Sequence, residues 1–294
     1  MQKLGKISVL GGDARIGALA AWLAQEGADV FVCGREDHPA QCHCVRDVRQ
    51  ALADTSAVIL PIPSFIEERY VYGMQEALSP EVLFAAVGGR CPVFGARLSE
   101  GVRSLAVRAG VRLIDYAELE TVQLKNAVVT AEGALYLAMQ ALDITLDGAR
   151  AAVLGYGRIG RVLARLLRDL GADVSVAVRS KTDVVRLQTE HYTPIVMVSG
   201  EEDSLLPLSE GYDVIFNTVP HRLLSTRLLT AISPRTLLIE LAGAPGGWNP
   251  DDAAKAGNRV VYAPGLPGKY APRTAGQLLA QGLLPYLRGE VPLP

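Results

Sequence analysis

The sequence has little cysteine, almost no net charge and no long uncharged run, and each of these absences excludes a class of protein. Its 294 residues include 4 cysteines, too few for a disulfide framework, so we expect a reduced, cytoplasmic setting. A formal net charge of −2 gives no overall field that would attract nucleic acid or an anionic membrane. The longest uncharged run near either end, residues 274–287, is shorter than the roughly 18 residues that a membrane span needs. We therefore expect neither a nucleic-acid partner nor a membrane partner.

The composition that remains is that of a packed globular protein. Hydrophobic residues make up 49% of the chain and charged residues 20%, which excludes a disordered or fibrous protein. At roughly 150 residues per domain, the length favours two domains. No apolar leader or cleavage site precedes the first strand-like run, at residues 7–10, so we do not expect a secreted protein.

Short apolar runs alternate with helix-like segments along the whole chain, which indicates βα units and parallel sheets. In the first half the predicted strands are residues 7–10, 30–33, 57–60, 82–87 and 111–114. In the second half they are residues 152–154, 174–178, 195–198, 214–216, 237–241 and 260–262. The predicted fold class is therefore α/β, with two Rossmann-like parallel-sheet domains joined by a long bridging helix.

The predicted domain boundaries follow from this repetition. Residues 1–122 form the first α/β domain, which we interpret as the substrate-type domain. Residues 123–272 form a Rossmann NAD(P)-binding domain that includes the apolar-periodic bridging helix at 126–142. In two-domain dehydrogenases the final helix often crosses back to the first domain, and residues 273–294 are the segment that would do so here.

A glycine fingerprint follows the first strand of the second domain. Gly155, Gly157 and Gly160 fit the pattern G-x-G-x-x-G, with a strand before it and an amphipathic helix after it. The first glycine allows the tight turn, the second lets backbone N–H groups approach a pyrophosphate, and the third lets the helix pack on the sheet. Arg158 and Ile159 complete the turn, so all five residues are candidates for dinucleotide binding. The alternative is a tight α/β turn that binds no ligand.

The end of the next predicted strand favours NADP over NAD. An NAD site usually presents an acidic residue there, which accepts hydrogen bonds from the ribose hydroxyls. This chain has Arg179, Ser180 and Lys181 instead, and cations bind a 2′-phosphate that a carboxylate would repel. Residues 150–186 hold 8 Lys or Arg against 3 Asp or Glu, a local excess of 5 positive charges around this loop. The alternative is that Arg179 and Lys181 are solvated and that NAD binds with fewer ribose contacts.

The first domain carries a degenerate version of the same glycine loop. Gly11 and Gly12 begin it, but Asp13 places a negative charge where a pyrophosphate would lie. We interpret this domain as a non-cofactor domain whose loop faces a substrate; a second nucleotide site and a purely structural turn are the alternatives. Ligands of open parallel sheets bind at the carboxyl ends of the strands. The candidate substrate contacts at such ends are Asp13, Arg15, Ser64 and Gly89.

Several stretches taken together resemble one family. They are residues 11–15 (GGDAR), 125–127 (KNA), 130–134 (TAEGA), 154–160 (LGYGRIG), 217–220 (NTVP), 263–272 (APGLPGKYAP) and 274–276 (TAG). This set resembles the A subunits of bacterial dipicolinate synthase over nearly the whole chain. Residues 130–133 and 264–272 are its most specific parts, because many dehydrogenases share the glycine fingerprint.

The resemblance implies a sporulation enzyme of the mother-cell cytoplasm that makes dipicolinate (pyridine-2,6-dicarboxylate). Its substrate would be the hydroxy-tetrahydro or dihydro diacid that dihydrodipicolinate synthase supplies. The resemblance also implies that the partner is a flavoprotein-like B subunit, and we expect the chain to form a homo-oligomer.

The turn at residues 217–220 also resembles 2-hydroxyacid dehydrogenases, where this strand end lines the nicotinamide pocket. Asn217, Thr218, Val219 and Pro220 are therefore further candidates for cofactor binding. His221 departs from the small residue expected at its position, so the resemblance assigns it no role.

The implied substrate carries two carboxylates, so its site needs cations. Arg15, Lys125 and Lys269 are the candidates, because each lies in a loop or at a helix start near the predicted interdomain cleft. Exposed surface charge is the alternative for each of them. Thr130, in the bridging helix, is a further candidate substrate contact.

Proton transfer from the ring or loss of water requires a general acid or base. Glu132 lies in the bridging helix, near Thr130 and Lys125, and is either such a base or an internal salt-bridge partner. His221 follows the predicted nicotinamide turn, where it would either move a proton or be an incidental loop histidine. Glu132 and His221, together with the nearby Lys125, are the candidate catalytic residues.

Two other functions stay open at this point. A two-domain 2-hydroxyacid dehydrogenase usually relies on an arginine and a Glu–His pair, and the 4 histidines of this chain form no convincing constellation of that kind. A non-catalytic nucleotide-binding subunit would instead bind the cofactor and leave the chemistry to a partner.

A cluster of potential metal ligands lies within twelve residues of the first domain. Its members are Cys33, His38, Cys42, His43 and Cys44. Their spacing is not the usual Cys-x₂-Cys, and no second ligand pair follows. We therefore favour a reduced loop with incidental thiols over a metal site.

Overall fold

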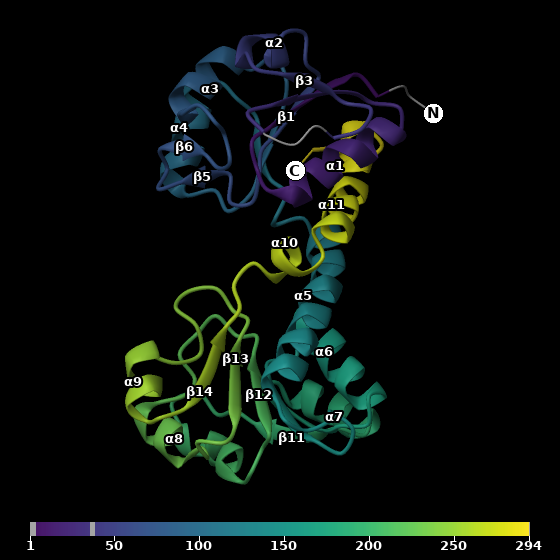
Figure 1. The fold of residues 1–294 in the computed structure, drawn as a ribbon. Helices are drawn as coiled ribbons and strands as arrows, with labels where there is room; N and C mark the ends of the chain where they lie inside the picture. The colour runs from purple at the N-terminus through teal and green to yellow at the C-terminus, as the bar shows by residue number, and fades with distance from the viewer. Residues whose placement is uncertain (1–3, 36–38, 294) are drawn as a thin grey trace. The chain divides into compact units, whose positions relative to one another are not determined.

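The computed structural model describes residues 4–35 and 39–293, and these residues build two six-stranded parallel sheets (Figure 1). The strand order is β3-β2-β1-β4-β7-β8 in the first sheet and β11-β10-β9-β12-β13-β14 in the second. In both sheets the order reverses beside the first strand, as in doubly wound Rossmann folds. The predicted α/β fold class, with two Rossmann-like parallel-sheet domains, is confirmed.

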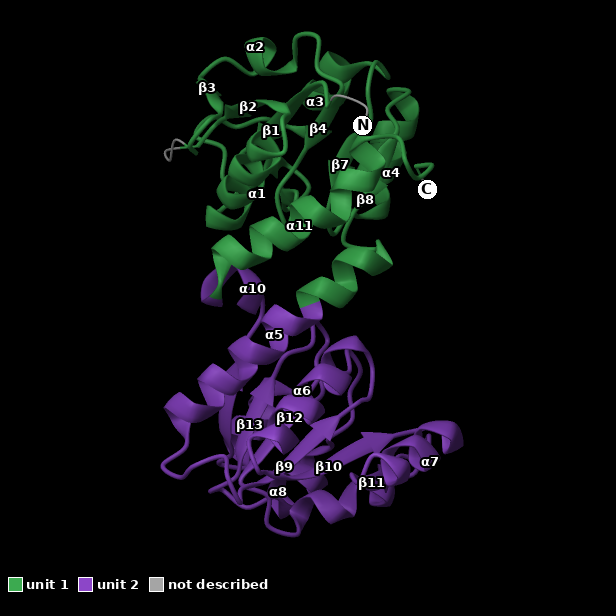
Figure 2. Ribbon diagram, turned by 90° about the vertical axis from the view of Figure 1, so that its right-hand side faces the viewer, with its two compact units in different colours: residues 1–126, 271–294 green, residues 127–270 purple. Residues whose placement is uncertain are grey.

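The chain divides into two compact units, which Figure 2 colours separately. The first unit consists of Met1–Asn126 together with Ala271–Pro294, and the second of Ala127–Tyr270. The long helix α5 (Glu120–Ala141) begins in the first unit and ends in the second. Each unit holds one of the two sheets.

The described residues of the first unit form the first sheet, a short hairpin and five helices besides the start of α5. Its strands are β1 (Lys6–Leu10), β2 (Asp29–Cys33), β3 (His43–Val45), β4 (Ala57–Ile59), β7 (Val93–Gly95) and β8 (Leu113–Asp115), with β5 (Phe65–Ile66) and β6 (Tyr70–Val71) forming the hairpin. Its helices are α1 (Ala14–Gln25), α2 (Val48–Leu52), α3 (Pro80–Val87), α4 (Glu100–Arg108) and α11 (Pro272–Leu287).

The prediction of a strand at residues 82–87 is wrong, because these residues belong to helix α3. Ser79 caps this helix by accepting a hydrogen bond from the N–H of Val82, and Pro80 occupies its first turn. The helix ends at Gly88, whose φ of 55° lies in the left-handed region that favours glycine. The strand of this βα unit is β7, which follows the helix.

Helix α11 packs against α1 inside the first unit, and both figures show the two helices side by side. Small residues allow the close approach: a Cβ at Gly276 would overlap the carbonyl oxygen of Arg15 and lie 2.8 Å from the backbone nitrogen of Leu19. Leu279 and Leu283 of α11 are buried in the core that this helix shares with the sheet.

The second unit contains the second sheet. Its strands are β9 (Arg150–Leu154), β10 (Asp173–Val178), β11 (Thr193–Val196), β12 (Val214–Asn217), β13 (Leu237–Glu240) and β14 (Arg259–Tyr262). Its helices, after the end of α5, are α6 (Arg158–Asp169), α7 (Lys181–Thr189), the 3₁₀ helix η1 (Glu202–Ser209), α8 (Thr226–Ala231), α9 (Pro250–Lys255) and α10 (Leu266–Tyr270).

Both faces of the second sheet are covered. Leu163 and Leu167 of α6 pack on one face, and Leu228 of α8 and Trp248 pack on the other. Because the faces are filled, the ends of the strands are the places left for a ligand. None of the described helices is long and apolar enough to cross a membrane.

Candidate functional site

The three glycines of the fingerprint have different surroundings. Gly155 has a φ of 95°, and a Cβ there would lie 2.7 Å from Cγ2 of Val219. A Cβ at Gly160 would overlap the carbonyl oxygen of Gly155, so only glycine lets α6 approach the turn this closely. A Cβ at Gly157 would have nothing within 4 Å, so this position borders open space.

The start of helix α6 can hold an anion. Gly157 is its N-cap residue and provides no side-chain hydrogen bond to the first turn. The N–H groups of a helix's first turn have no partner inside the helix, and the helix dipole adds partial positive charge there. Together with the open space at Gly157, this arrangement fits a phosphate or pyrophosphate.

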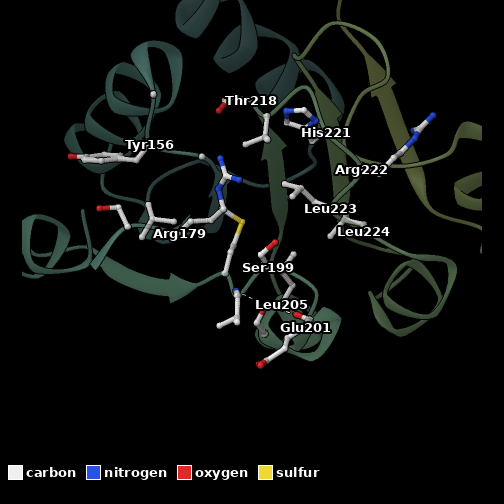
Figure 3. A pocket seen from close by; sticks show the side chains of 18 of the residues that line it. Tyr156, Arg179, Ser199, Glu201, Leu205, Thr218, His221, Arg222, Leu223 and Leu224 are labelled. Atoms are coloured by element: carbon white, nitrogen blue, oxygen red, sulfur yellow. Dashed lines mark hydrogen bonds between the residues drawn. The ribbon is translucent and has the colours of Figure 1, made fainter. Parts of the chain in front are cut away.

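A cavity of about 960 Å³ adjoins this turn. Figure 3 shows Arg179 extending into it from the end of β10, with Thr218, His221 and Leu223 lining another side. The candidate residues that line it are Gly155, Gly157, Arg179, Ser180, Thr218, Val219, Pro220 and His221. Its size is at the upper end of the range for small-molecule sites. The fold thus brings most of the predicted cofactor-binding residues to one place.

The end of β10 presents one cation to this cavity rather than two. Arg179 is exposed and lines the cavity, and Ser180 caps α7 by accepting a hydrogen bond from the N–H of Asp183. Lys181 does not line this cavity; it borders a separate shallow depression on α7. Asp183, which was not among the predicted residues, lines the cavity and accepts a hydrogen bond from Arg186 at 3.0 Å.

Four other predicted cofactor residues do not line the cavity: Arg158, Ile159, Gly160 and Asn217. Gly160 is buried beneath the turn, and Arg158 is exposed at the start of α6. Asn217 is fully buried: its Nδ2 donates to the carbonyl oxygen of Val219 at 2.9 Å, and its Oδ1 accepts from the N–H of Val219 at 3.1 Å. Asn217 therefore shapes the turn after β12 from behind the cavity.

Glu240, a buried carboxylate at the end of β13, was not predicted from the sequence. It accepts hydrogen bonds from Nδ2 of Asn217 at 2.7 Å, from the N–H of Ala242 at 2.9 Å and from the N–H of Gly247 at 2.6 Å. Burial raises the pKa of this carboxyl above its ordinary value, although these hydrogen bonds and the charge of Arg222 act in the opposite direction. An acidic residue inside the otherwise apolar run 237–241 was the available signal.

Two further groups of lining residues were also missed. One follows β11 and consists of Met197, Val198, Ser199, Gly200, Glu201, Ser204 and Leu205. The other follows His221 and consists of Arg222, Leu223, Leu224 and Ser225; Figure 3 shows Arg222 pointing away from Arg179. Both groups come after strands of the same sheet, so the rule that ligands lie at the carboxyl ends of strands would have included them.

Tyr156, between the first two glycines, ties the turn to the end of α7. Its hydroxyl donates a hydrogen bond to Oε2 of Glu190 at 2.6 Å. Burial, more than this hydrogen bond, raises the pKa of the phenol, so the hydroxyl keeps its proton and remains a donor at neutral pH.

In the first unit, Asp13 and Arg15 pair with each other. Nη2 of Arg15 lies 2.7 Å from Oδ2 of Asp13 and donates to the carbonyl oxygen of Ile62 at 3.0 Å. Asp13 also caps α1 by accepting a hydrogen bond from the N–H of Arg15. This pairing gives both residues a structural role at the carboxyl ends of β1 and β4.

The first glycine loop is covered by the protein's own chain. The N–H of Gly12 donates to the carbonyl oxygen of Tyr72 at 2.7 Å, and Nη1 of Arg35 donates to the carbonyl oxygen of Gly11 at 2.9 Å. A Cβ at Gly73 would lie 2.5 Å from the nitrogen of Gly12. Backbone N–H groups engaged in this way do not approach a pyrophosphate, which supports the interpretation of the first unit as a non-cofactor domain.

Ser64 and Gly89 do not lie together. Ser64 is buried after β4, where its Oγ accepts a hydrogen bond from the N–H of Ala96 at 2.7 Å. The prediction that Gly89 lies at the carboxyl end of a strand is wrong, because it follows helix α3 and precedes β7. A Cβ there would lie 2.7 Å from the carbonyl oxygen of Gly110, which precedes β8, so Gly89 is at the amino ends of these strands.

The remaining candidates are divided between the two units. In the first unit, Nζ of Lys125 donates to Oε1 of Gln281, a neutral partner, at 2.7 Å. In the second unit, Thr130 is buried on α5, whereas Glu132 is exposed on the same helix and Lys269 is exposed on α10.

The cysteine cluster of the first domain does not form a metal site in the part of the chain that the structure describes. No group of three or more His, Cys, Asp or Glu side chains is placed to hold a metal there, and His38 lies outside the described residues. Burial raises the pKa of Cys33 and of Cys42 to about 11, so both thiols are protonated at neutral pH.

The chain matches known proteins over almost its full length. Residues 6–117 match the model of the N-terminal domain of the dipicolinate synthase A subunit. Over 287 residues the chain is 32% identical to the A subunit of dipicolinate synthase from Bacillus subtilis (strain 168), and the match covers 95% of this chain and 94% of that protein. The chain belongs to the family of dipicolinate synthase A subunits.

Solved structures of this family have the same fold. The Bacillus halodurans protein superposes with a TM-score of 0.88 at 28% identity, covering 98% of this chain and 99% of that one. The transhydrogenase of Sinorhizobium meliloti has a TM-score of 0.71 at 16% identity, covering 97% and 94%, which shows a shared fold alone. Residues 145–234 match the NADPH-binding domain of acetohydroxy acid isomeroreductase, a range that includes the glycine turn, Arg179 and Thr218.

Proposed function

We propose that this chain is an NADP-dependent oxidoreductase subunit that forms dipicolinate from its hydroxy-tetrahydro or dihydro precursor. The observation that carries the proposal is the full-length similarity to the A subunit of dipicolinate synthase, combined with a cavity at the glycine turn of the second unit. Removal of one hydride and one proton from a dihydropyridine diacid gives the aromatic product, and a hydroxy-tetrahydro precursor must first lose water.

The residues around the cavity fit a dinucleotide. The N-terminus of α6 and the open space at Gly157 would hold the pyrophosphate, and the turn after β12 would lie beside the nicotinamide. When bound, the oxidised nicotinamide supplies the acceptor for the hydride. The protein's part is to position both reactants and to hold or move the remaining proton.

Arg179 is the residue that we propose for recognition of the 2′-phosphate of NADP. It is exposed at the end of β10 and lines the cavity. We expect Arg179→Asp to weaken NADPH binding about 100-fold relative to NADH, because a salt-bridged phosphate becomes a repelled one. Lys181→Asp is the matched control, since Lys181 lies outside the cavity and its substitution changes the charge equally. Titration calorimetry with both nucleotides measures this; an unchanged preference in Arg179→Asp would mean that Arg179 does not select the cofactor.

The substrate's two carboxylates call for cations near the reacting ring. We propose Lys125 and Lys269 for this role, because Arg15 is committed to Asp13 and to the carbonyl oxygen of Ile62. Glu132 and His221 are the proposed proton-transfer groups, and both are exposed to solvent. Asp13 is paired with Arg15, and Ser64 and Thr130 are buried, so we propose no direct substrate contact for these three residues.

Single substitutions test these four residues in the oxidation assay. We expect Lys125→Met and Lys269→Met to raise KM about tenfold, because each removes one charge-assisted contact to a carboxylate. We expect Glu132→Gln or His221→Gln to lower kcat about 100-fold, as general acid–base catalysis implies. Gln188→Met is a control at an exposed position on α7, away from the cavity residues. Four variants with wild-type kinetics would show that this choice of residues is wrong.

We further propose that the chain works with a flavoprotein-like B subunit in the mother-cell cytoplasm during sporulation. The experiment that tests the function is a precursor-oxidation assay with and without that subunit, following NADPH fluorescence and dipicolinate absorbance. Formation of dipicolinate supports the proposal. Turnover of 2-oxo acids with NADPH instead would indicate a 2-hydroxyacid dehydrogenase. Cofactor binding without turnover of either the precursor or a 2-oxo acid would indicate a non-catalytic subunit.

A further inference from the structure

We propose that Glu240 is a positioning residue for the cofactor cavity: hydrogen bonds to its buried carboxylate hold two walls of that cavity in place. This inference rests on the proposed function only in taking a nicotinamide nucleotide as the occupant. Glu240 does not line the cavity itself, so any effect that it has on a ligand must pass through the residues that it contacts.

The first wall is the turn after β12. Oε1 of Glu240 accepts from Nδ2 of Asn217, and the same Nδ2 donates to the carbonyl oxygen of Val219. Oδ1 of Asn217 accepts from the N–H of Val219, so the amide group is fixed on both sides. Because β12 and β13 pair Asn217 with Glu240 in register, the two side chains meet at the same edge of the sheet. The carboxylate therefore fixes the orientation of the amide that shapes this turn.

The second wall is the segment Leu223–Leu224. Oε2 of Glu240 accepts from the N–H of Gly247, and the carbonyl oxygen of Gly247 accepts from the N–H groups of Leu223 at 2.7 Å and Leu224 at 2.9 Å. A single residue, Gly247, thus links the carboxylate to the backbone that lines the cavity.

Two adjacent glycines make this contact possible. A Cβ at Gly246 would lie 2.9 Å from Oε2 of Glu240, and a Cβ at Gly247 would lie 2.6 Å from Nδ2 of Asn217. The run GG at 246–247 is therefore required by the carboxylate and amide that it packs against, rather than by a ligand.

The charged form of the carboxylate is the form that fits this network. All three partners of Glu240 are N–H donors, so a protonated oxygen would face a donor and lose a hydrogen bond. Arg222 is the charged side chain that acts on this carboxylate, and its positive charge favours the ionised form. Because burial raises the pKa of Glu240, we expect the network to weaken at a higher pH than an ordinary glutamate would allow.

The test compares NADPH binding by the full-length wild type and by Glu240→Gln between about pH 8 and pH 5. Glutamine has the same shape, but its amide nitrogen cannot accept from the N–H of Gly247. At the upper pH we expect Glu240→Gln to bind NADPH about tenfold more weakly than the wild type, because it lacks one buried hydrogen bond to a charged group. As pH falls, we expect wild-type binding to weaken toward that of Glu240→Gln. The titration of the nucleotide's own phosphates is common to both proteins and cancels in their ratio.

Matched variants separate positioning from a general loss of structure. Glu210→Gln removes the same charge from an exposed residue outside the cavity and should leave the affinity unchanged. In a Trp22→Phe background, Trp248 is the one remaining tryptophan of the chain; it is buried beside Gly247, so its emission reports on this segment. In this background we expect the emission of Glu240→Gln to match the emission that the protein with Glu240 shows at low pH.

The outcomes separate the two proposals. If the wild type binds no nicotinamide nucleotide, the proposed function fails. If the wild type binds NADPH and the ratio of wild-type to Glu240→Gln affinity is one at every pH, Glu240 positions nothing and this inference is overturned. The emission of Trp248 in the Trp22→Phe protein that keeps Glu240 tests the inference between the same pH limits, even where Glu240→Gln does not fold; an unchanged spectrum would contradict it.

Discussion

Replacing Gly157 with valine is expected to weaken NADPH binding about 100-fold while leaving the fold intact, because the new side chain takes space that the pyrophosphate needs. A Cβ at this position meets no protein atom within 4 Å, and its φ of −80° is allowed for any residue. The Cβ of valine would therefore occupy ligand space without meeting a protein atom. Titration calorimetry gives the affinity, and circular dichroism should give a melting temperature within about 2 °C of the wild type.

Gly243→Val provides the matched control for this prediction. A Cβ at Gly243 also meets nothing within 4 Å, and the residue does not line the cavity. We expect wild-type affinity from this control. Equal affinities for Gly157→Val and the wild type would mean that no pyrophosphate lies at the start of α6, and the cavity would then need another ligand.

The parts of the fold that local sequence signals determine could be predicted. The glycine fingerprint predicted a strand, a turn and a helix, and β9, Gly155 to Gly157 and α6 follow that order. Residues 82–87 show where local signals mislead: VLFAAV is apolar and short, so it resembles a buried strand, but Ser79 and Pro80 begin a helix there. That error placed Gly89 at the wrong end of the sheet, because the position of a loop residue depends on which element precedes it.

The contacts that complete the candidate site depend on residues far apart in the sequence. Arg179, Thr218 and His221 could be selected because each follows a predicted strand. The bond between Asn217 and Glu240 joins residues 23 positions apart, and it requires the register of β12 against β13, which no single strand reveals. Likewise, nothing near Gly12 indicates that Tyr72 would cover its N–H. Local patterns identified candidates, and tertiary pairing decided which of them border open space.

The second large effect is expected from Gly276→Leu, which should destabilise the first unit by about 3 kcal/mol, since overpacking a tight helix contact is costly. A Cβ at Gly276 would overlap the carbonyl oxygen of Arg15, which is backbone and cannot rotate away, and would lie 2.7 Å from the Cβ of Ala18. Leucine would push α11 off α1 and expose Leu279 and Leu283, which are now buried. Urea unfolding followed by circular dichroism measures the loss.

Gln277→Leu is the control for Gly276→Leu, because it adds the same side chain one position along α11 at an exposed site and should change stability little. NADPH binding tests separately whether the substitution affects the second unit. All residues that line the cavity belong to the second unit, whereas Gly276, Arg15 and Ala18 belong to the first. We therefore expect Gly276→Leu to keep its NADPH affinity in the absence of urea while its first unit unfolds at lower urea. If Gly276→Leu unfolds at the same urea concentration as the wild type, α11 does not pack on α1 in solution. If Gly276→Leu loses NADPH affinity in the absence of urea, the second unit depends on the first to hold its cofactor.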